Sequence, residues 1–234
     1  MVQGQKKTDQ IIREAARKVF QREGYEGARM QAIADEANIN KAMLHYYHRS
    51  KEKLFDEVFE EDYMTKLVPL IMILRDPSIP VEEQIIRFTR EYLNTMIAEP
   101  RLALFIMYEL GRNPDRLLKM AKKMVPVSQT DETDHPKFSA TTFMDQIREG
   151  IEKGIYNDIN PDHFAVSFLG MCTYPIAARS TVRHAYQMDD SQYNAFLRER
   201  KYQIVEHAFR VLMKPEYFEK RIKTVKAEVE NDMR

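Results

Sequence analysis

The sequence contains little glycine and almost no cysteine. Glycine accounts for 7 of 234 residues, about 3% against a usual ~7%. Strands joined by tight hairpins need glycine for positive φ, so this scarcity favours helices with short connections. The single cysteine, Cys172, excludes an internal disulfide framework and a cysteine-rich metal site. We expect a protein of the reducing cytoplasm.

Long apolar runs are also missing. The longest uncharged stretches cover residues 67–74 and 164–178, which is short of the ~18–20 residues that a membrane span requires. The first residues, MVQGQKKTDQII, include no apolar segment of the kind found in secretory signals. The sequence therefore predicts a soluble protein without a secretory signal.

Neither sign of charge is in excess. The chain carries 36 Lys+Arg and 36 Asp+Glu, so its overall charge will not drive it onto nucleic acid or a membrane surface. The basic residues are unevenly placed, because residues 1–53 hold 11 Lys/Arg against 7 Asp/Glu. By itself this small asymmetry is weak evidence for a polyanionic partner.

Common catalytic and metal-binding motifs are absent. The chain has no Gly-x-Ser-x-Gly, Gly-x-Gly-x-x-Gly, P-loop or His-Glu-x-x-His sequence. His45 and His48 stand three residues apart, but no cysteine or further histidine is near enough in sequence to complete a metal site. We expect one surface and one packed histidine here, no enzyme, no cofactor and no metal.

What the sequence does show is a 3.6-residue apolar repeat along most of its length. A first helix is expected to end at Gly24, and its buried face comprises Ile11, Ile12, Ala15, Ala16, Val19 and Phe20. Two short helices are expected over residues 29–37 and 41–47. Ser50 is expected to cap a fourth, longer helix.

The rest of the chain continues in helices, so the predicted fold class is all-α. Pro69 and Pro77 are expected to interrupt the chain after the fourth helix. Pro175 should kink or interrupt a later one, and the polar run at 128–137 has loop composition. The further helices are expected over residues 81–99, 101–112, 114–125, 140–155, 161–187, 191–213 and 215–232.

The two short helices and the turn between them predict helix-turn-helix geometry. Asn38 is one of the few non-glycine types that tolerate the left-handed conformation such a turn needs. Ile39 is expected to fill the space between the helices, and Asn40 to cap the second one. Ala34 is small enough to let the second helix approach closely.

The segment from Gly24 to Phe55 resembles the DNA-binding domain of TetR-family transcriptional regulators. The matching stretches are GY (24–25), IADEA (33–37), KAMLHYY (41–47) and SKEKL (50–54). The resemblance covers about the first 55 residues, and a length near 230 is also typical of the family. It implies a three-helix helix-turn-helix domain over residues 1–53. It further implies a larger helical effector-binding and dimerisation domain over residues 54–234.

Three residues depart from the usual family pattern. Arg29 stands where a small hydroxyl residue commonly caps the second helix, so either that cap is lost or Arg29 itself reaches phosphate. Asn38 replaces the usual glycine, and His48 replaces the usual phenylalanine. None of the three changes the class of protein that the resemblance implies.

The resemblance implies that the helix over residues 41–47 lies in the major groove of a double-stranded DNA operator. The expected base-contacting residues are Lys41, Ala42, Met43, His45 and Tyr46, and Asn40 at the helix start is also expected at the DNA interface. The expected phosphate-contacting set comprises Arg29, Gln31, Tyr47 and Lys51. Packing is the alternative role for the two tyrosines, and a solvated surface position is the alternative for Lys51.

The resemblance also implies that the remainder binds a small effector. Flexible and aromatic side chains suit a pocket for an apolar or aromatic compound, but they suit an ordinary core equally well. The expected ligand-contacting residues are Tyr92, Met96, Phe105, Tyr108, Met120, Met124, Phe143, Met171 and Tyr174.

A homodimer is expected through the helices near 161–187 and 191–213, so that two heads read a near-palindromic operator. On family grounds we expect a repressor that is released when an effector moves the helix following Ser50. Two alternatives stay open at this point. One is a helical adaptor that binds protein, and the other is a DNA-binding protein without a small-molecule effector.

Overall fold

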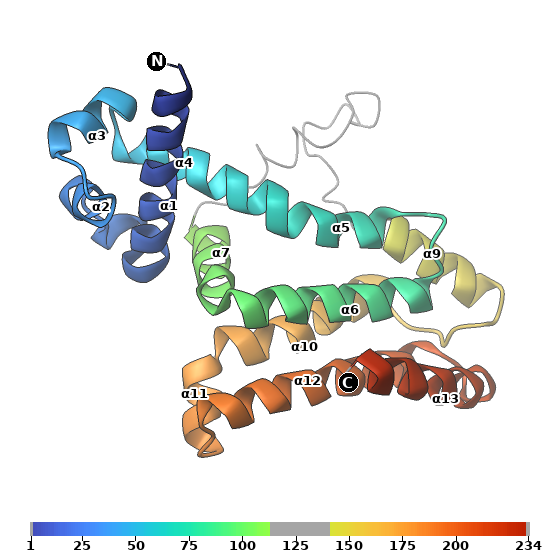
Figure 1. Cartoon of the computed structure of the whole chain (residues 1–234). Helices are drawn as coiled ribbons and strands as arrows, with labels where there is room; N and C mark the ends of the chain where they lie inside the picture. The colour runs from blue at the N-terminus through green and yellow to red at the C-terminus, as the bar shows by residue number, and fades with distance from the viewer. Residues whose placement is uncertain (1, 113–140, 233–234) are drawn as a thin grey trace. The chain divides into compact units, whose positions relative to one another are not determined.

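The computed structural model of the chain describes residues 2–112 and 141–232 (Figure 1). These residues form helices and connections, with no β-strand beyond one isolated bridge between Tyr156 and Met213. The predicted all-α class is confirmed. None of the described helices has the length and apolarity needed to cross a membrane. The helix expected over 114–125 and the loop expected over 128–137 lie outside the described residues.

Four helices form the amino-terminal part, and the last three of them begin within one residue of where the sequence predicts. They are α1 (Val2–Gly27), α2 (Met30–Glu36), α3 (Lys41–Tyr47) and α4 (Lys51–Asp62). Within α1 the helical dihedrals break at Gly24, which has φ 68°. Glycine adopts this left-handed conformation without the steric cost that a Cβ imposes, which explains the predicted end of the first helix at this position.

The helical path continues past Pro69, so the interruption expected there was wrong. A π-helical turn, η1 (Tyr63–Leu67), follows α4 and leads into α5 (Val68–Arg75). The Val68 N–H donates to the carbonyl of Tyr63, five residues back. A proline ring collides with the carbonyl four residues back in a regular α-helix. The wider π turn changes the spacing of the carbonyls just before Pro69 and lets the helix accommodate it.

The later helices follow the predicted ranges within three residues, with one exception. The helix expected over 161–187 is two helices, α10 (Pro161–Ala177) and α11 (Arg179–Ala185). The division falls at Ala178, just after Pro175, which α10 includes. The other helices are α6 (Val81–Ala98), α7 (Pro100–Arg112), α9 (Thr141–Glu152), α12 (Asp190–Leu212) and α13 (Pro215–Asp232).

The chain forms two compact units, an amino-terminal unit of Met1–Val68 with Leu104–Arg112 and a carboxy-terminal unit of the remainder. The amino-terminal unit extends beyond the expected boundary after residue 53, because the apolar face of α4 completes its core. Phe55 of α4 lies in edge contact with Phe20 of α1, at 4.9 Å between ring centroids. Phe105 packs against both Phe55 and Phe59 of α4.

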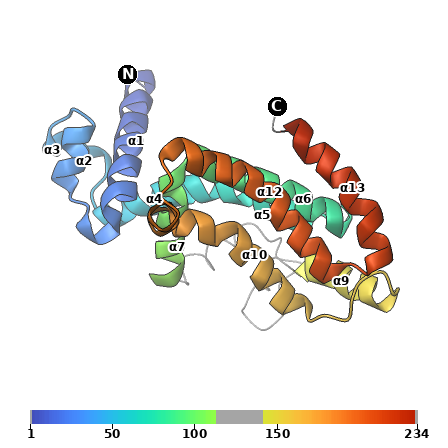
Figure 2. The ribbon, with the colours of Figure 1, turned by 90° about the horizontal axis from the view of Figure 1, so that it is seen from below.

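The carboxy-terminal unit is built on three helices, α6, α10 and α12, which contact one another (Figure 2). Helix α9 packs on α10, and α13 packs on α12. Phe88 of α6 lies 5.6 Å from Phe168 of α10, ring to ring. Cys172 is buried nearby in α10, and burial raises the pKa of its thiol to about 12. This cysteine is therefore a core residue and not a thiolate nucleophile at neutral pH.

A tyrosine fixes the connection that leaves α9. The Tyr156 hydroxyl donates to a Glu82 carboxylate oxygen of α6 at 2.8 Å. Burial and the neighbouring Glu82 charge both raise the pKa of Tyr156, so the phenol stays protonated and able to donate. Its ring lies directly over Gly150, where an added Cβ would stand 2.2 Å from ring carbons. Glycine is required here because the aromatic ring occupies the space of a side chain.

We therefore expect Gly150→Ala to lower the free energy of unfolding by about 1–3 kcal/mol, the usual cost of overpacking a core. A Cβ at Gly111, also helical, would meet no atom within 4 Å. Gly111→Ala should leave stability unchanged or raise it by up to ~1 kcal/mol. Urea denaturation followed by circular dichroism measures both, and equal midpoints for the two variants would contradict the packing described.

Candidate nucleic-acid interface

The turn between α2 and α3 has the geometry that the sequence predicts. Asn38 adopts φ 53° in the left-handed region. The Ile39 N–H then donates to the Ala34 carbonyl at 3.0 Å, which closes the end of α2. The Asn40 side chain accepts from the Met43 N–H at 2.7 Å and caps α3. These three local interactions set the angle at which α3 leaves the turn.

The start of α2 is less well capped. Arg29 occupies the capping position in an extended conformation, and its side chain makes no capping hydrogen bond. The side-chain cap that a small hydroxyl residue commonly supplies at this position in the family is therefore lost in this chain. Arg29 is exposed, as is Gln31, whose amide donates to Asp35 at 2.8 Å one turn further along α2. The side chains of Arg29 and Gln31 are therefore both accessible to solvent or to a binding partner.

Helix α3 presents most of its surface to solvent. Leu44 is its one fully buried side chain. At 100° per residue, the five expected base-contacting side chains cover about half of the circumference, on the side away from Leu44. All five are exposed: Lys41, Ala42, Met43, His45 and Tyr46. Tyr46 is 74% exposed and Met43 is 42% exposed.

An exposed tyrosine beside an exposed methionine is unusual for a protein surface that meets only water. Tyr46 is in edge contact with the ring of Tyr47, at 5.4 Å between centroids, and Tyr47 itself is half-buried. The structure thus separates the two tyrosines: Tyr47 contributes to packing, and Tyr46 projects outward. The exposed residues of α3, with Arg29, Gln31 and Asn40, form what we call the reading face.

Lys51, which is expected to contact phosphate, makes its hydrogen bonds within the amino-terminal unit. Its ammonium donates to the carbonyl of Tyr25 at 2.8 Å and to that of Ala28 at 3.1 Å, with Glu26 further off at 3.5 Å. It also lies 4.5 Å from the centre of the Tyr25 ring. Carbonyls at the end of a helix lack intrahelical donors. Lys51 supplies donors to those at the end of α1, and its three N–H groups are directed inward.

His45 and His48 separate into one surface and one packed histidine, as expected. His45 is exposed on α3, whereas His48 is 5% exposed and forms the C-cap of α3. The His48 Nε2 lies 2.9 Å from Asp9 Oδ1 of α1, and its Nδ1 lies 3.3 Å from Glu57 Oε2 of α4. Among the described residues no cluster of three potential metal-ligating side chains occurs.

Ion pairs hold the other helices of the unit against α1. Lys18 and Arg22 both approach Glu36 of α2, at 3.3 and 3.6 Å. Arg17 pairs with buried Asp62 at 2.6 Å and with Glu61 at 2.9 Å. Burial alone would lower the pKa of Arg17, but these two carboxylates outweigh it and raise that pKa. The guanidinium is thus a permanent charge that fastens α1 to the end of α4.

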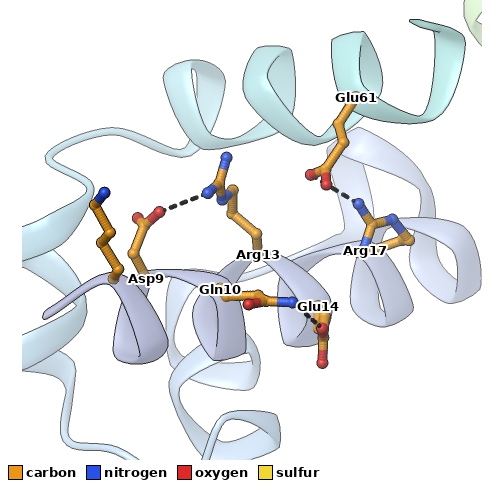
Figure 3. Close-up of a pocket in the computed structure, with 7 residues that line it drawn as sticks. Asp9, Gln10, Arg13, Glu14, Arg17 and Glu61 are labelled. Atoms are coloured by element: carbon orange, nitrogen blue, oxygen red, sulfur yellow. Dashed lines mark hydrogen bonds and ion pairs between the residues drawn. The ribbon is translucent and has the colours of Figure 1, made fainter. Parts of the chain in front are cut away.

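The amino-terminal unit also has a polar cavity of about 440 Å³ along α1 (Figure 3). The residues that line it do not belong to the reading face. Figure 3 shows Arg13 directed toward Asp9 and Arg17 toward Glu61. The full lining is Lys6, Asp9, Gln10, Arg13, Glu14, Arg17 and Glu61. Cations and carboxylates are equal in number there, so the cavity has no net charge to attract a polyanion.

Those expected ligand-contacting residues whose side chains the structure describes differ in burial and in the unit to which they belong. Met96 and Phe143 are fully buried in the carboxy-terminal unit, where Tyr92 and Met171 are half-buried. Phe105 belongs to the core of the amino-terminal unit. Tyr174 is 64% exposed on α10. The side chains of Tyr108, Met120 and Met124 lie outside the described residues.

A few polar groups lie inside the carboxy-terminal unit, and one of them, the Thr89 hydroxyl, is not among the residues that the sequence predicts. The Thr89 hydroxyl of α6 is fully buried, and its polar neighbour is the thiol of Cys172, a weak hydrogen-bonding group. Tyr92, one turn along α6, interacts with the Thr173 hydroxyl, and burial raises the pKa of this tyrosine. Thr89 and Tyr92 therefore point their polar atoms toward α10.

Residues 12–58 match the family model described as "Bacterial regulatory proteins, tetR family". The chain is 37% identical over 93 residues to the HTH-type transcriptional repressor NicS of Pseudomonas putida, a match that covers 38% of this chain and 43% of NicS. It is 24% identical over 145 residues to the HTH-type transcriptional regulator YhgD of Bacillus subtilis, covering 62% and 68% of the two chains. The match thus spans less than half of NicS.

Solved structures agree with this fold. The TetR-family protein CprB of S. coelicolor A3(2) superposes with a TM-score of 0.57 at 18% identity, covering 96% of this chain and 98% of CprB. A TetR transcription regulator from Haloarcula marismortui gives a TM-score of 0.55 at 19% identity, covering 89% and 100%. The α2–turn–α3 geometry defines a helix-turn-helix protein. The helix-turn-helix segment, within residues 12–58, is thus similar to that of the tetR family of regulatory proteins.

The inward contacts of Lys51 predict a structural effect of its removal. Lys51→Met should lower the free energy of unfolding by about 1–3 kcal/mol, because the part-buried carbonyls of Tyr25 and Ala28 lose charge-assisted donors. Lys53 lies two residues on in the same helical turn and is exposed. Lys53→Met removes the same charge and should change stability by no more than ~0.5 kcal/mol. Thermal unfolding of both variants checks this, and equal shifts would show that Lys51 acts only through its charge.

Proposed function

We propose that this chain is a DNA-binding transcriptional repressor. It binds a near-palindromic operator as a homodimer, with α3 of each copy in a major groove. A small apolar or aromatic compound that binds in the carboxy-terminal unit releases it from DNA. The observation that carries the proposal is the reading face, where one short helix is exposed on all sides except that of Leu44.

The reading face has the chemistry for bases as well as for backbone. Lys41, at the start of α3, suits the guanine O6 and N7 acceptors, and Met43 suits a thymine methyl. Exposed Arg29 suits a phosphate. The outward position of Tyr46 adds a hydroxyl that is able to donate or accept. The name of the relative NicS as a repressor favours repression over activation.

Dimerisation is supported by apolar side chains that remain exposed on α10 and α12, two helices that contact each other. Val166 is 72% exposed, and Tyr174 shares the exposed side of α10, two turns further on. Leu169 of α10 and Val211 of α12 are also exposed. A two-fold axis would bury each of these surfaces against its own copy. Two heads about 34–36 Å apart would then meet successive major grooves.

An effector site is supported by the polar groups beneath this surface. The hydroxyls of Thr89 and Tyr92 of α6 lie next to Cys172 and Thr173 of α10, and the Tyr92 ring stacks on that of Phe88. Apolar linings with a few convergent polar atoms are typical of small-molecule sites. The proposed effector is therefore an apolar or aromatic compound with at least one hydrogen-bonding group.

DNA binding is tested by the salt dependence of affinity for a labelled duplex from the region upstream of the chain's own gene. If the Lys41 side chain contacts a base, Lys41→Ala should weaken DNA binding by about 1–3 kcal/mol. If it contacts a phosphate, the substitution should reduce the slope of log affinity against log salt concentration by about 1. Lys153→Ala removes a lysine of the carboxy-terminal unit that is paired with Glu149 and should have neither effect. Salt-independent binding, or equal loss in both variants, would contradict the proposal.

Dimerisation is tested by charge on the exposed side of α10. Val166→Glu should convert the dimer to a monomer in sedimentation equilibrium, because two carboxylates would be buried against each other. Tyr217 of α13 is also a large exposed apolar residue, and Tyr217→Glu should leave the dimer intact. A wild-type protein that sediments as a monomer at micromolar concentration would refute the proposed assembly.

A further inference from the structure

His48 is held in a way that only one of its protonation states satisfies. Both ring nitrogens face carboxylate oxygens, Nε2 that of Asp9 at 2.9 Å and Nδ1 that of Glu57 at 3.3 Å. The ring is 5% exposed. A neutral imidazole carries a single N–H, so one nitrogen would turn its lone pair toward an acceptor. The imidazolium donates from both nitrogens and satisfies both carboxylates.

The charged groups around the His48 ring lie on α1 and α4, the two helices whose carboxylates it contacts. Asp9 on α1 also pairs with Arg13 at 2.8 Å, and Glu57 lies on α4. On its own helix the nearest titratable neighbour in sequence is His45, which is exposed, and Arg49 follows it in the chain. The carboxylates thus contact the ring directly, whereas the guanidinium of Arg13 acts on one of them.

The position of His48 connects this contact to the reading face. His48 is the C-cap of α3, and its backbone N–H donates to the Leu44 carbonyl. Its side chain joins this end of α3 to α1 through Asp9 and to α4 through Glu57. A seven-residue helix has little stability of its own. The orientation of the reading face therefore depends on the contacts at its two ends.

We propose that His48 is a positioning residue for DNA binding, which holds α3 in its reading orientation as an imidazolium clamped between Asp9 and Glu57. Loss of one proton makes one of the two contacts repulsive and loosens the end of α3. Operator affinity then falls as pH rises through the range in which histidine changes charge. This inference rests on the proposed function, because it takes DNA binding as its readout.

The test compares the wild type with His48→Phe and Glu57→Gln by fluorescence anisotropy on one duplex, at pH 6.0, 7.0 and 8.0 and constant ionic strength. His48→Phe fills the space with a ring that does not titrate. Glu57→Gln leaves a neutral imidazole fully bonded, because the amide is able to donate to Nδ1. His45 is present in all three proteins, so its contribution to the pH dependence is common to them.

For the wild type, the ratio of the dissociation constant at pH 8 to that at pH 6 should exceed the same ratio for either variant by about tenfold. This is the effect expected from the loss of one charge-assisted contact. An equal pH dependence in all three proteins would overturn the proposal. If His48→Phe does not fold, as judged by circular dichroism, Glu57→Gln alone decides the comparison.

Nuclear magnetic resonance of the free protein separates this proposal from DNA binding itself. The His48 ring nitrogens should both be protonated at pH 6, and the amide signals of Leu44 and Tyr47 should shift as the ring loses its proton. In Glu57→Gln those amide shifts should be smaller. A neutral His48 ring at pH 6, or α3 amides that ignore its titration, would refute the clamp even if no duplex binds. Absence of DNA binding with an intact clamp would instead refute the proposed function.

Discussion

The arrangement of the amino-terminal unit depends on holding a two-turn helix that would not persist by itself. Helix α3 buries one side chain, Leu44, so the hydrophobic effect fixes its position only weakly. Contacts at the two ends of α3 hold the helix in place instead. Asn40 caps the first turn with a side-chain hydrogen bond, and His48 ties the last turn to α1 and α4. Because Leu44 is the one fully buried side chain of α3, its five exposed side chains remain available to a partner.

The sequence predicts the local part of this arrangement well. Asn38 indicates the left-handed turn and Asn40 the cap, because each acts on backbone groups within three residues. The helix bounds follow from the apolar repeat for the same reason. The sequence does not predict the contacts of Lys51, whose carbonyl partners lie 23–26 residues away. It likewise gives no sign that His48 meets Asp9 and Glu57, since those pairings exist only once three helices have packed.

In the carboxy-terminal unit the sequence predicts helices but not which apolar residues are core and which are surface. Met96 and Tyr174 are equally good pocket residues by composition, yet the first is fully buried and the second is exposed. Phe105 belongs to the other compact unit altogether. Side-chain type sets the free energy of burial, but the partner that covers a residue is set by tertiary packing. The buried hydroxyl of Thr89 carries no sequence pattern that distinguishes it from a surface polar group.

The central claim is that two copies of α3 read DNA as a symmetric pair. Selection of bound duplexes from a randomised 30-base-pair pool, followed by hydroxyl-radical footprinting of the enriched sequence, tests this most directly. The account predicts a two-fold symmetric sequence with two protected segments about one helical turn, 34–36 Å, or a multiple of it apart. A pool that stays random after repeated selection, or a single unsymmetric protected segment, would contradict it.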